Sequence, residues 1–357
     1  MGHVKRSLLR AEAYFDRLKQ KIDSGNQPLK IVPYHGFGSR KELYLKGRVL
    51  RENRVKRASG RESIWSNMLN MYRRFESDEI PGARVQAFFS SMRQDAVTDE
   101  EGYFEVRFSR LQQLDRSQIW HSILLKLPHR SGGNSVTAEG KVLIPPDTAQ
   151  FGVISDIDDT VVKTDSTSLL RMVRTVFTAN ARTRIAFQGI AKFYAALQNG
   201  KTGHDLNPIF YVSSSPWNLH DLLIDFFAFQ QIPLGPLMLR DWGLSEEQDL
   251  STPQRSHKLK AITRIFDMYS HLDFVLIGDD AQEDPEIYLE TVRLYRDRVR
   301  AVYIRNVVRD QERPKTVRDI ANEVARAGSR MLLINETEQA AKDARDSGLI
   351  QSSISLE

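Results

Sequence analysis

The sequence predicts two folded parts: a small β-sandwich-like domain over residues 29–146, and a doubly wound α/β domain with a mostly parallel sheet over residues 147–357. Three observations support this prediction. Short runs of alternating or β-branched residues fill the first part. Continuous apolar runs alternate with helical patterns in the second part, as expected for a sheet covered on both faces. Between the two, Pro145 and Pro146 interrupt the pattern and mark the predicted boundary.

The sequence of residues 1–28 predicts an amphipathic helix that precedes both domains. Its apolar residues fall at steps of three and four, the spacing of one helix face: Leu8, Ala11, Phe15, Leu18 and Ile22. The segment lacks the continuous apolar core of a signal peptide. A helix packed on its own protein is the simpler interpretation, and a membrane-surface or partner helix is the alternative.

The β-rich part contains five predicted strands, at residues 41–50, 83–91, 102–108, 121–127 and 141–146. A turn cluster, TDEEG, precedes the third strand and supplies Gly102 for a backbone with positive φ. Several short strands at close spacing indicate a small sandwich or barrel. No group of chemically reactive side chains is visible here, so a targeting or interaction role is the default expectation.

The α/β part contains six continuous apolar runs that predict strands, at residues 151–155, 207–213, 236–240, 273–278, 301–305 and 329–334. Helical patterns lie between or after them, at residues 218–230, 257–269, 285–297 and 316–327. Chemistry in such sheets gathers outside the carboxyl ends of the strands. Reactive residues should therefore recur where these apolar runs stop.

Reactive residues do recur there. Asp156 and Asp158 follow the first run, Ser213 ends the second, Asp279 ends the fourth with Asp284 shortly after, and Lys258 opens a helix. A carboxylate that attacks a phosphate monoester needs a divalent cation to offset charge repulsion, and carboxylates such as Asp156 and Asp279 suit Mg²⁺. Asp158 has the spacing for proton transfer to the leaving group. Lys258 and Ser213 can hold the transferring phosphoryl oxygens.

Composition limits the other possibilities. The 357 residues include no cysteine, which excludes disulfides and thiolate metal sites and fits a reducing compartment. A formal net charge of +5 suits anionic substrates but is too small to indicate nucleic-acid binding. No apolar run approaches the roughly 20 residues needed to span a bilayer. We expect a cytoplasmic protein that can associate peripherally with a membrane.

These motifs resemble the haloacid dehalogenase (HAD) superfamily, in DIDDT (156–160), Ser213, Lys258 and GDDAQED (278–284). Over about residues 150–310, the phrases DIDDTVVKT, FYVSSSPWNL and LIGDDAQEDPEIY are similar to the actin-patch type of phosphatidate phosphatase and its bacterial relatives. The resemblance implies a HAD-like Rossmannoid fold and a bacterial member of this phosphatase family. It also implies Mg²⁺-dependent hydrolysis of phosphatidate to diacylglycerol and phosphate.

The resemblance also implies a role for each matching residue. Asp156 would be the nucleophile that forms an aspartyl-phosphate, and Asp158 the proton donor and later the base. Asp279 would complete the Mg²⁺ site with Asp156 and the main-chain carbonyl of Asp158, supported by Asp284. Two choices stay open: whether Asp279 or its neighbour Asp280 contacts the metal, and whether Ser213 or the next serine binds phosphate.

The implied substrate is an anionic phospholipid, with protein partners unknown. The basic and apolar stretch 167–193 could face headgroups, or its apolar residues could pack on the sheet while its arginines are solvated. Two alternative functions remain: a HAD-type phosphatase of another phosphomonoester, and a non-catalytic phosphatidate-binding module. A second basic run is by default a solvated loop, with lipid contact as the hypothesis: Arg48, Arg51, Arg54, Lys56, Arg57 and Arg61.

Overall fold

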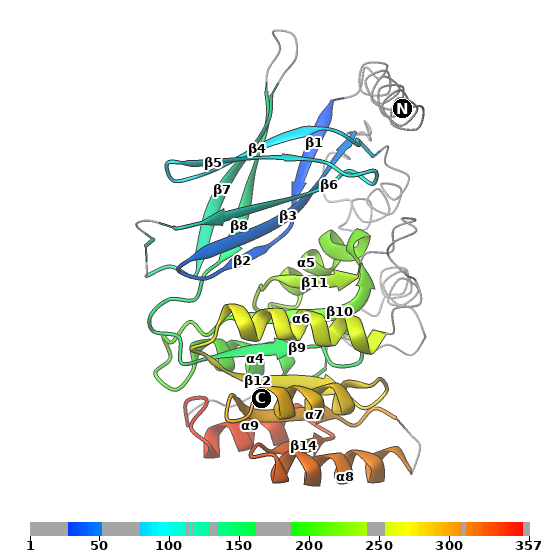
Figure 1. The fold of residues 1–357 in the computed structure, drawn as a ribbon. Helices are drawn as coiled ribbons and strands as arrows, with labels where there is room; N and C mark the ends of the chain where they lie inside the picture. The colour runs from blue at the N-terminus through cyan, green and yellow to red at the C-terminus, as the bar shows by residue number, and fades with distance from the viewer. Residues whose placement is uncertain are drawn as a thin grey trace, which may run out of the picture. The chain divides into compact units, whose positions relative to one another are not determined.

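A computed structural model of the chain describes residues 28–51, 79–111, 114–115, 117–128, 135–161, 187–240, 254–308 and 312–352. The predicted N-terminal helix, the basic run beyond Arg51 and most of the stretch 167–193 lie outside these residues. The chain divides into two compact units, one within Met1–Leu114 and Trp120–Val142, the other within Asp115–Ile119 and Leu143–Glu357. Each unit contains one sheet (Figure 1).

The first unit is built on an eight-stranded sheet whose strand pairings are antiparallel. Neighbours follow the order β1-β3-β2-β8-β7-β4-β5, and β6 pairs with the other edge of β3. Strand β6 also lies in contact with β5, the last strand of this path. Leu45, Phe108 and Leu125 are buried on the inner side. The strands are β1 (Leu29–Pro33), β2 (Gly36–Gly38), β3 (Glu42–Arg51), β4 (Arg84–Phe89), β5 (Met92–Val97), β6 (Tyr103–Ser109), β7 (Trp120–Leu127) and β8 (Val136–Leu143).

The predicted strands of this unit are confirmed, with one shift in position. The strand predicted at 141–146 begins at Val136 and ends at Leu143, since the prolines that follow cannot donate to a ladder. Strands β1, β2 and β5 were not predicted. The β5 sequence, MRQDAV, has no apolar alternation and exposes most of its side chains. Gly102 has a φ of 77°, as its turn requires. The structure confirms an antiparallel sheet, and its assignment to a sandwich stays a prediction.

The second unit contains a six-stranded parallel sheet in the order β11-β10-β9-β12-β13-β14. The predicted parallel sheet is therefore confirmed. Strand β9 lies inside the sheet and is buried along its whole length, which explains its uninterrupted apolar sequence. The strands are β9 (Phe151–Ser155), β10 (Ile209–Pro216), β11 (Leu237–Arg240), β12 (Asp273–Asp279), β13 (Val299–Arg305) and β14 (Met331–Ile334).

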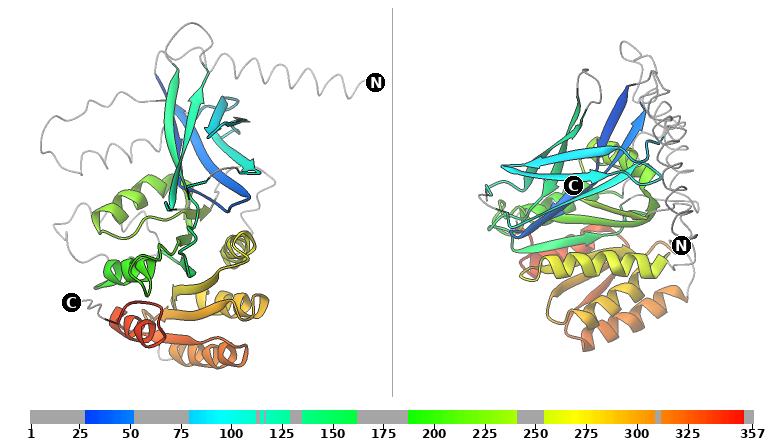
Figure 2. Two further views of the ribbon diagram at one scale, coloured as in Figure 1. Left: turned by 90° about the vertical axis from the view of Figure 1, so that its left-hand side faces the viewer. Right: turned by 45° about the horizontal axis from the view of Figure 1, so that its top comes forward.

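Helices cover both faces of the parallel sheet. Figure 2 shows α6 and α7 on one side of it, and α4 and α9 on the other. The four predicted helices are confirmed with bounds that differ by a few residues. The helices are α4 (Ile190–Asn199), a short 3-10 helix η2 (Trp217–Leu219), α5 (His220–Phe229), α6 (Gln254–Met268), α7 (Asp284–Leu294), α8 (Arg313–Arg326) and α9 (Thr337–Asp346).

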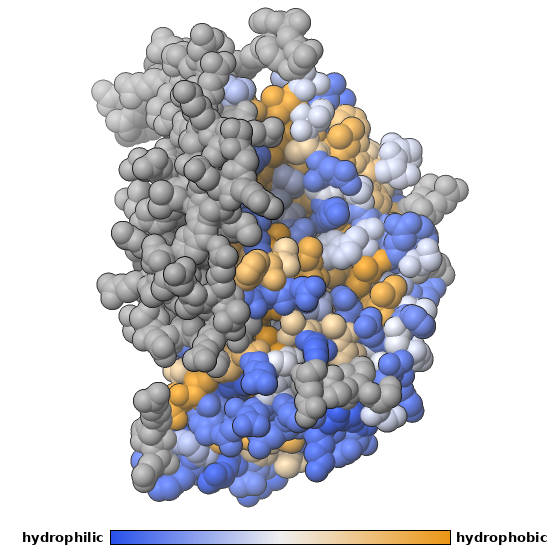
Figure 3. Space-filling model, turned by 180° about the vertical axis from the view of Figure 1, so that it is seen from behind, coloured by the Kyte–Doolittle hydropathy of each residue, from blue (hydrophilic) through white to orange (hydrophobic). Residues whose placement is uncertain are grey.

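Apolar side chains are scattered over the described surface. Its exposed large apolar side chains lie on separate elements, and Figure 3 shows polar and apolar residues intermixed on the face that it presents. Single exposed apolar residues of this kind are ordinary. Among the helices described, none has both the length and the apolarity needed to cross a bilayer.

Candidate active site

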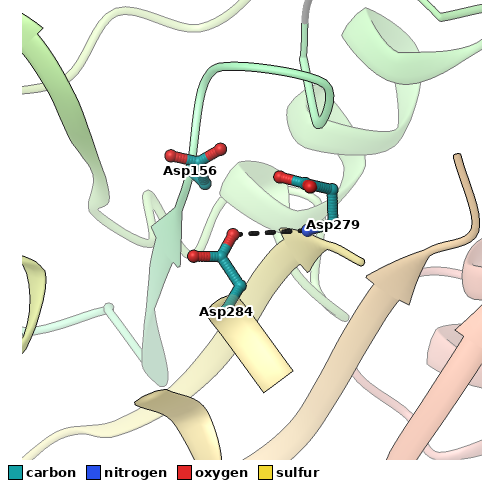
Figure 4. Close-up of side chains that lie close together, drawn as sticks. All are labelled: Asp156, Asp279 and Asp284. Atoms are coloured by element: carbon teal, nitrogen blue, oxygen red, sulfur yellow. Dashed lines mark hydrogen bonds between the residues drawn. The ribbon is translucent and has the colours of Figure 1, made fainter. Parts of the chain in front are cut away.

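The candidate site lies where neighbouring parallel strands end. Strand β9 pairs with β10 on one side and with β12 on the other, so the residues after all three strands meet at one edge of the sheet. Asp156 follows β9, Asp279 ends β12, and Asp284 opens α7. One carboxylate oxygen from each of these three residues lies within 4.8 Å of the other two. Figure 4 shows the three carboxylates converging from separate elements.

Lys258 on α6 joins this cluster from the helical layer. Its buried Nζ lies 2.9 Å from Asp156 Oδ1 and 2.7 Å from Asp284 Oδ1. Burial alone would lower the pKa of Lys258, but the Asp156 and Asp284 carboxylates raise it above its ordinary value. The side chain is therefore an ammonium ion held between two carboxylates. The structure brings this lysine beside Asp156 although the two are about 100 residues apart in the chain, and its role stays a prediction.

Asp156 is the least satisfied polar group of the cluster. Neither of its buried carboxylate oxygens accepts a hydrogen bond from the described part of the chain, although Oδ1 forms the ion pair with Lys258. Burial raises the pKa of Asp156 well above its usual range, Lys258 opposes this, and the carboxylates of Asp284 and Asp279 add to it. A buried carboxylate without hydrogen bonds is costly unless a cation compensates it.

Asp279 is held in place by main-chain groups of its own loop. Its Oδ1 accepts hydrogen bonds from the N–H groups of Ala281 at 2.7 Å and Gln282 at 3.1 Å. Burial and the neighbouring Asp284 raise the pKa of Asp279 to about 7. The Asp279 N–H donates to Asp284 Oδ2 at 3.3 Å, drawn as the dashed line in Figure 4. Gly278 permits this approach, because a Cβ there would lie 2.5 Å from Asp284 Oδ2.

Asp280 points away from the cluster. Its Oδ1 accepts hydrogen bonds from the N–H groups of Val307 at 2.8 Å and Val308 at 3.0 Å. Adjacent residues at the end of a strand face opposite sides, so only one of the two aspartates can reach the clustered carboxylates. That residue is Asp279, the one favoured from the sequence.

Asp158 is engaged by two serines of β10. Its Oδ2 accepts hydrogen bonds from Ser213 Oγ at 3.0 Å and Ser215 Oγ at 3.3 Å. Burial raises the pKa of Asp158, while the Ser213 hydrogen bond opposes this. Ser215 was not predicted, although its i, i+2 relation to Ser213 would have indicated a shared side of the strand. The Ser214 hydroxyl is buried and has no hydrogen-bond partner among the described residues.

Arg305 is a further buried charge that was not predicted. It ends β13 in register with Asp279. Its guanidinium donates to Thr337 Oγ1 at 3.0 Å and lies 3.9 Å from the centre of the Phe187 ring. Burial lowers the pKa of Arg305 to about 10, which leaves it charged at neutral pH. The strand-end rule that identified Asp156 applies equally to the last residue of AVYIR.

The part of the chain that carries this cluster is similar to known proteins. Residues 151–306 match the family model described as the catalytic domain of phosphatidate phosphatase APP1. Phosphatidate phosphatase APP1 of Saccharomyces cerevisiae is 31% identical over 158 residues, which cover 43% of this chain and 26% of that protein. The uncharacterized protein C29B5.04c of Schizosaccharomyces pombe is 29% identical over 163 residues, covering 45% of this chain and 26% of that protein.

These matches have limited extent. They span about a quarter of the length of the two yeast relatives. Among solved structures, a carbohydrate acetylesterase from Xanthomonas citri aligns with a TM-score of 0.34 and 12% identity, covering 90% of this chain and 75% of that one, a likeness too low to support an argument. Because both curated relatives are yeast proteins, bacterial membership stays a prediction. The family match nevertheless contains every residue of the cluster, from Asp156 to Asp284.

Proposed function

We propose that this protein is a Mg²⁺-dependent phosphatidate phosphatase that releases phosphate from phosphatidate through an aspartyl-phosphate on Asp156. One observation supports the proposal most directly. Residues 151–306 match the catalytic-domain family. The same segment contains the clustered side chains Asp156, Lys258, Asp279 and Asp284. A HAD-like Rossmannoid fold is part of the proposal, supported by the buried strand β9 carrying the nucleophile inside a parallel sheet.

The clustered residues fit a magnesium ion. Asp156 has buried oxygens that lack hydrogen bonds, and Asp279 and Asp284 place carboxylate oxygens beside it. The three carboxylates of Asp156, Asp279 and Asp284 surround one buried cation, Lys258, so a divalent cation would balance the local charge. Carboxylate oxygens are the ligands that Mg²⁺ prefers. We assign Asp156, Asp279 and the Asp158 carbonyl as ligands, with Asp284 supporting them through its contacts to Lys258 and the Asp279 N–H.

Asp156 acts first in the proposed reaction. A bound Mg²⁺ would supply charge neutralisation between the phosphate dianion and the attacking carboxylate. Asp156 attacks phosphorus, the bond from phosphorus to the diacylglycerol oxygen breaks, and an aspartyl-phosphate forms. Lys258 orients the Asp156 carboxylate through their 2.9 Å ion pair. Lys258 would also offset the charge of the phosphoryl oxygens, and the Ser213 hydroxyl would donate a hydrogen bond to them.

Asp158 is the proposed proton donor and acceptor in both steps. Its raised pKa favours the carboxylic acid, which donates its proton to the leaving alkoxide of diacylglycerol. The resulting carboxylate accepts a proton from the water that attacks the aspartyl-phosphate. This second step releases inorganic phosphate, regenerates the Asp156 carboxylate and returns the proton to Asp158. Ser213 and Ser215 hold Asp158 in position for both transfers.

The lipid substrate is the most specific part of the proposal. It is supported by the family match and by the activity for which the Saccharomyces cerevisiae relative is named, and it implies peripheral association with a membrane. The test is phosphate release from phosphatidate in mixed micelles and from water-soluble phosphomonoesters, each with and without Mg²⁺. We expect Mg²⁺-dependent release from phosphatidate that is lost in Asp156→Asn. Turnover of soluble esters without lipid turnover would reject phosphatidate, and lipid binding without any phosphate release would indicate a binding module.

A further inference from the structure

Arg313 lies outside the segment that matches the catalytic-domain family. It nevertheless donates hydrogen bonds to the loop between Asp279 and Asp284. We propose that Arg313 is a positioning residue that sets the affinity of the metal site by orienting the main-chain donors of Asp279. This inference rests on the proposed function, because it assigns a determinant of the proposed Mg²⁺ site. Arg313 would act on this site only through its hydrogen bonds to the loop 280–283 and to the start of α7.

The guanidinium of Arg313 reaches three separate points of the loop and of α7. Its Nε donates to the Asp280 carbonyl at 2.8 Å, and its Nη2 donates to the Gln282 carbonyl at 2.6 Å. The same group forms a two-pronged ion pair with Glu286, from Nη1 to Oε1 at 2.6 Å and from Nη2 to Oε2 at 3.0 Å. Both side chains of this pair are partly buried, at 21% and 28% exposed. The loop is thus tied to the first residue of α8.

One peptide group links Arg313 to the metal site. The Asp280 carbonyl that accepts from Arg313 belongs to the same peptide unit as the Ala281 N–H, which donates to Asp279 Oδ1 at 2.7 Å. In a trans peptide the carbonyl and the N–H point in opposite directions, so holding one aims the other. Hydrogen bonds in such a chain also strengthen one another by polarisation. Arg313 therefore acts on Asp279 through the Asp280–Ala281 peptide.

The opposite side of the loop is held independently. The Asp280 side chain accepts hydrogen bonds from the N–H groups of Val307 and Val308. The loop is therefore restrained from both sides, which fixes the Ala281 and Gln282 N–H groups that donate to the Asp279 carboxylate. Outer residues that orient metal ligands in this way contribute strongly to metal affinity.

The geometry requires arginine and not merely a positive charge. Three guanidinium nitrogens share the contacts to two carbonyls and one carboxylate, in the planar fork that arginine supplies. A lysine ammonium is a compact group and cannot reach all three partners. Arg313→Lys consequently keeps the charge near the site but releases the Asp280 carbonyl or the Glu286 carboxylate.

The test measures Mn²⁺ binding by electron paramagnetic resonance on the full chain, in the absence of substrate. We expect Arg313→Lys to weaken Mn²⁺ binding by about 10-fold or more, the usual effect of losing an outer ligand-orienting contact. The matched control is Arg293→Gln, which removes an exposed ion pair to Glu323 between the same two helices and should leave binding unchanged. Raising the Mg²⁺ concentration should restore phosphate release by Arg313→Lys.

The outcomes separate this inference from the proposed function. If Asp279→Asn weakens Mn²⁺ binding and folded Arg313→Lys does not, the inference is overturned and the metal site stands. If neither variant affects binding, both are overturned. Should Arg313→Lys fail to fold, Glu286→Gln decides the matter, because it loosens the same guanidinium and is expected to weaken binding in the same direction by a smaller factor. Unchanged binding in folded Glu286→Gln would then overturn the inference.

Discussion

The two sheets of this protein differ in where their buried charged residues lie. In the antiparallel sheet, Lys46 is buried beside the Tyr103 ring at 4.6 Å, and the charged pair Arg84–Asp95 lies on the surface. In the unit of the parallel sheet, buried charged residues gather at the strand ends and on the helices beside them: Asp156, Lys258, Asp279, Asp280, Asp284 and Arg305. Antiparallel strands end alternately at opposite edges, whereas parallel strands all present their carboxyl ends at one edge. Only the second arrangement collects reactive groups from distant segments.

The largest expected effect comes from removing the proposed nucleophile. Asp156→Asn should reduce phosphate release by at least about 10⁴-fold, as for essential groups that act as a unit. Lys258 keeps Asp284 as a partner, so we expect the fold to survive. Phosphate release and thermal unfolding measure the two effects, and substantial remaining turnover in this variant would exclude Asp156 as the nucleophile.

A control at the other end of the same sheet sharpens this comparison. Asp273 begins β12, six residues before Asp279, and forms a partly exposed ion pair with Arg300. Asp273→Asn makes the same chemical change at the amino end of a strand. Its turnover should match that of the unmodified protein, and a large loss there would contradict the assignment of chemistry to the carboxyl edge.

A smaller effect is expected from the proposed acid and base. Asp158→Asn should slow turnover by about 10²–10⁴-fold, the range for a positioned proton donor. The asparagine can still accept hydrogen bonds from Ser213 and Ser215, so the local structure should be retained. Steady-state kinetics at saturating Mg²⁺ measure the loss. A normal rate would mean that another group transfers the proton.

Two glycine substitutions, one in each sheet, compare the effect of steric crowding on metal binding and on stability. In Gly278→Ala the new methyl group would lie 2.5 Å from Asp284 Oδ2, so we expect metal binding to weaken by about 10-fold, as for other misplaced ligands. In Gly47→Ala the methyl group would lie 2.5 Å from the Phe104 ring in the antiparallel sheet, costing about 1–3 kcal/mol of stability by overpacking. Mn²⁺ titration and denaturant unfolding distinguish them. The comparison fails if Gly47→Ala shifts metal affinity as much as Gly278→Ala does.

The smallest effect is expected at Ser215. Ser215→Ala removes a 3.3 Å hydrogen bond to Asp158, which still keeps the 3.0 Å bond from Ser213. A net loss of about 1 kcal/mol corresponds to a several-fold lower rate. Ser215→Thr retains a hydroxyl and should recover most of it. Equal rates for the alanine variant and the unmodified protein would show that Ser213 alone positions Asp158.

Much of the fold was predictable because its signals are local. All six strands of the parallel sheet were predicted from apolar runs, and four of its helices from their periodicity. Strand β5 was missed because an exposed strand carrying charges lacks the usual alternation. Helix α9 was missed because its apolar face is made of alanines, although Glu336 and Gln339 form a capping box that would have indicated its start.

The candidate site was predictable in part. The strand-end rule identified Asp156, Asp158, Ser213 and Asp279, because each stands directly after an apolar run. The functions assigned to these residues stay predictions. Arg305 obeys the same rule and was overlooked. Arg313 could not have been found this way, since it opens a helix and acts through the main chain of another segment.

The sequence by itself determined the parallel sheet and the positions at which reactive side chains leave it, because backbone conformation and burial are encoded in windows of a few residues. Only the tertiary structure decided that Asp279 and not Asp280 joins Asp156, that two serines share Asp158, and that Arg313 holds the loop between Asp279 and Asp284. These outcomes depend on strand order, register and side-chain direction. Such contacts join residues far apart in the chain, and no local pattern specifies them.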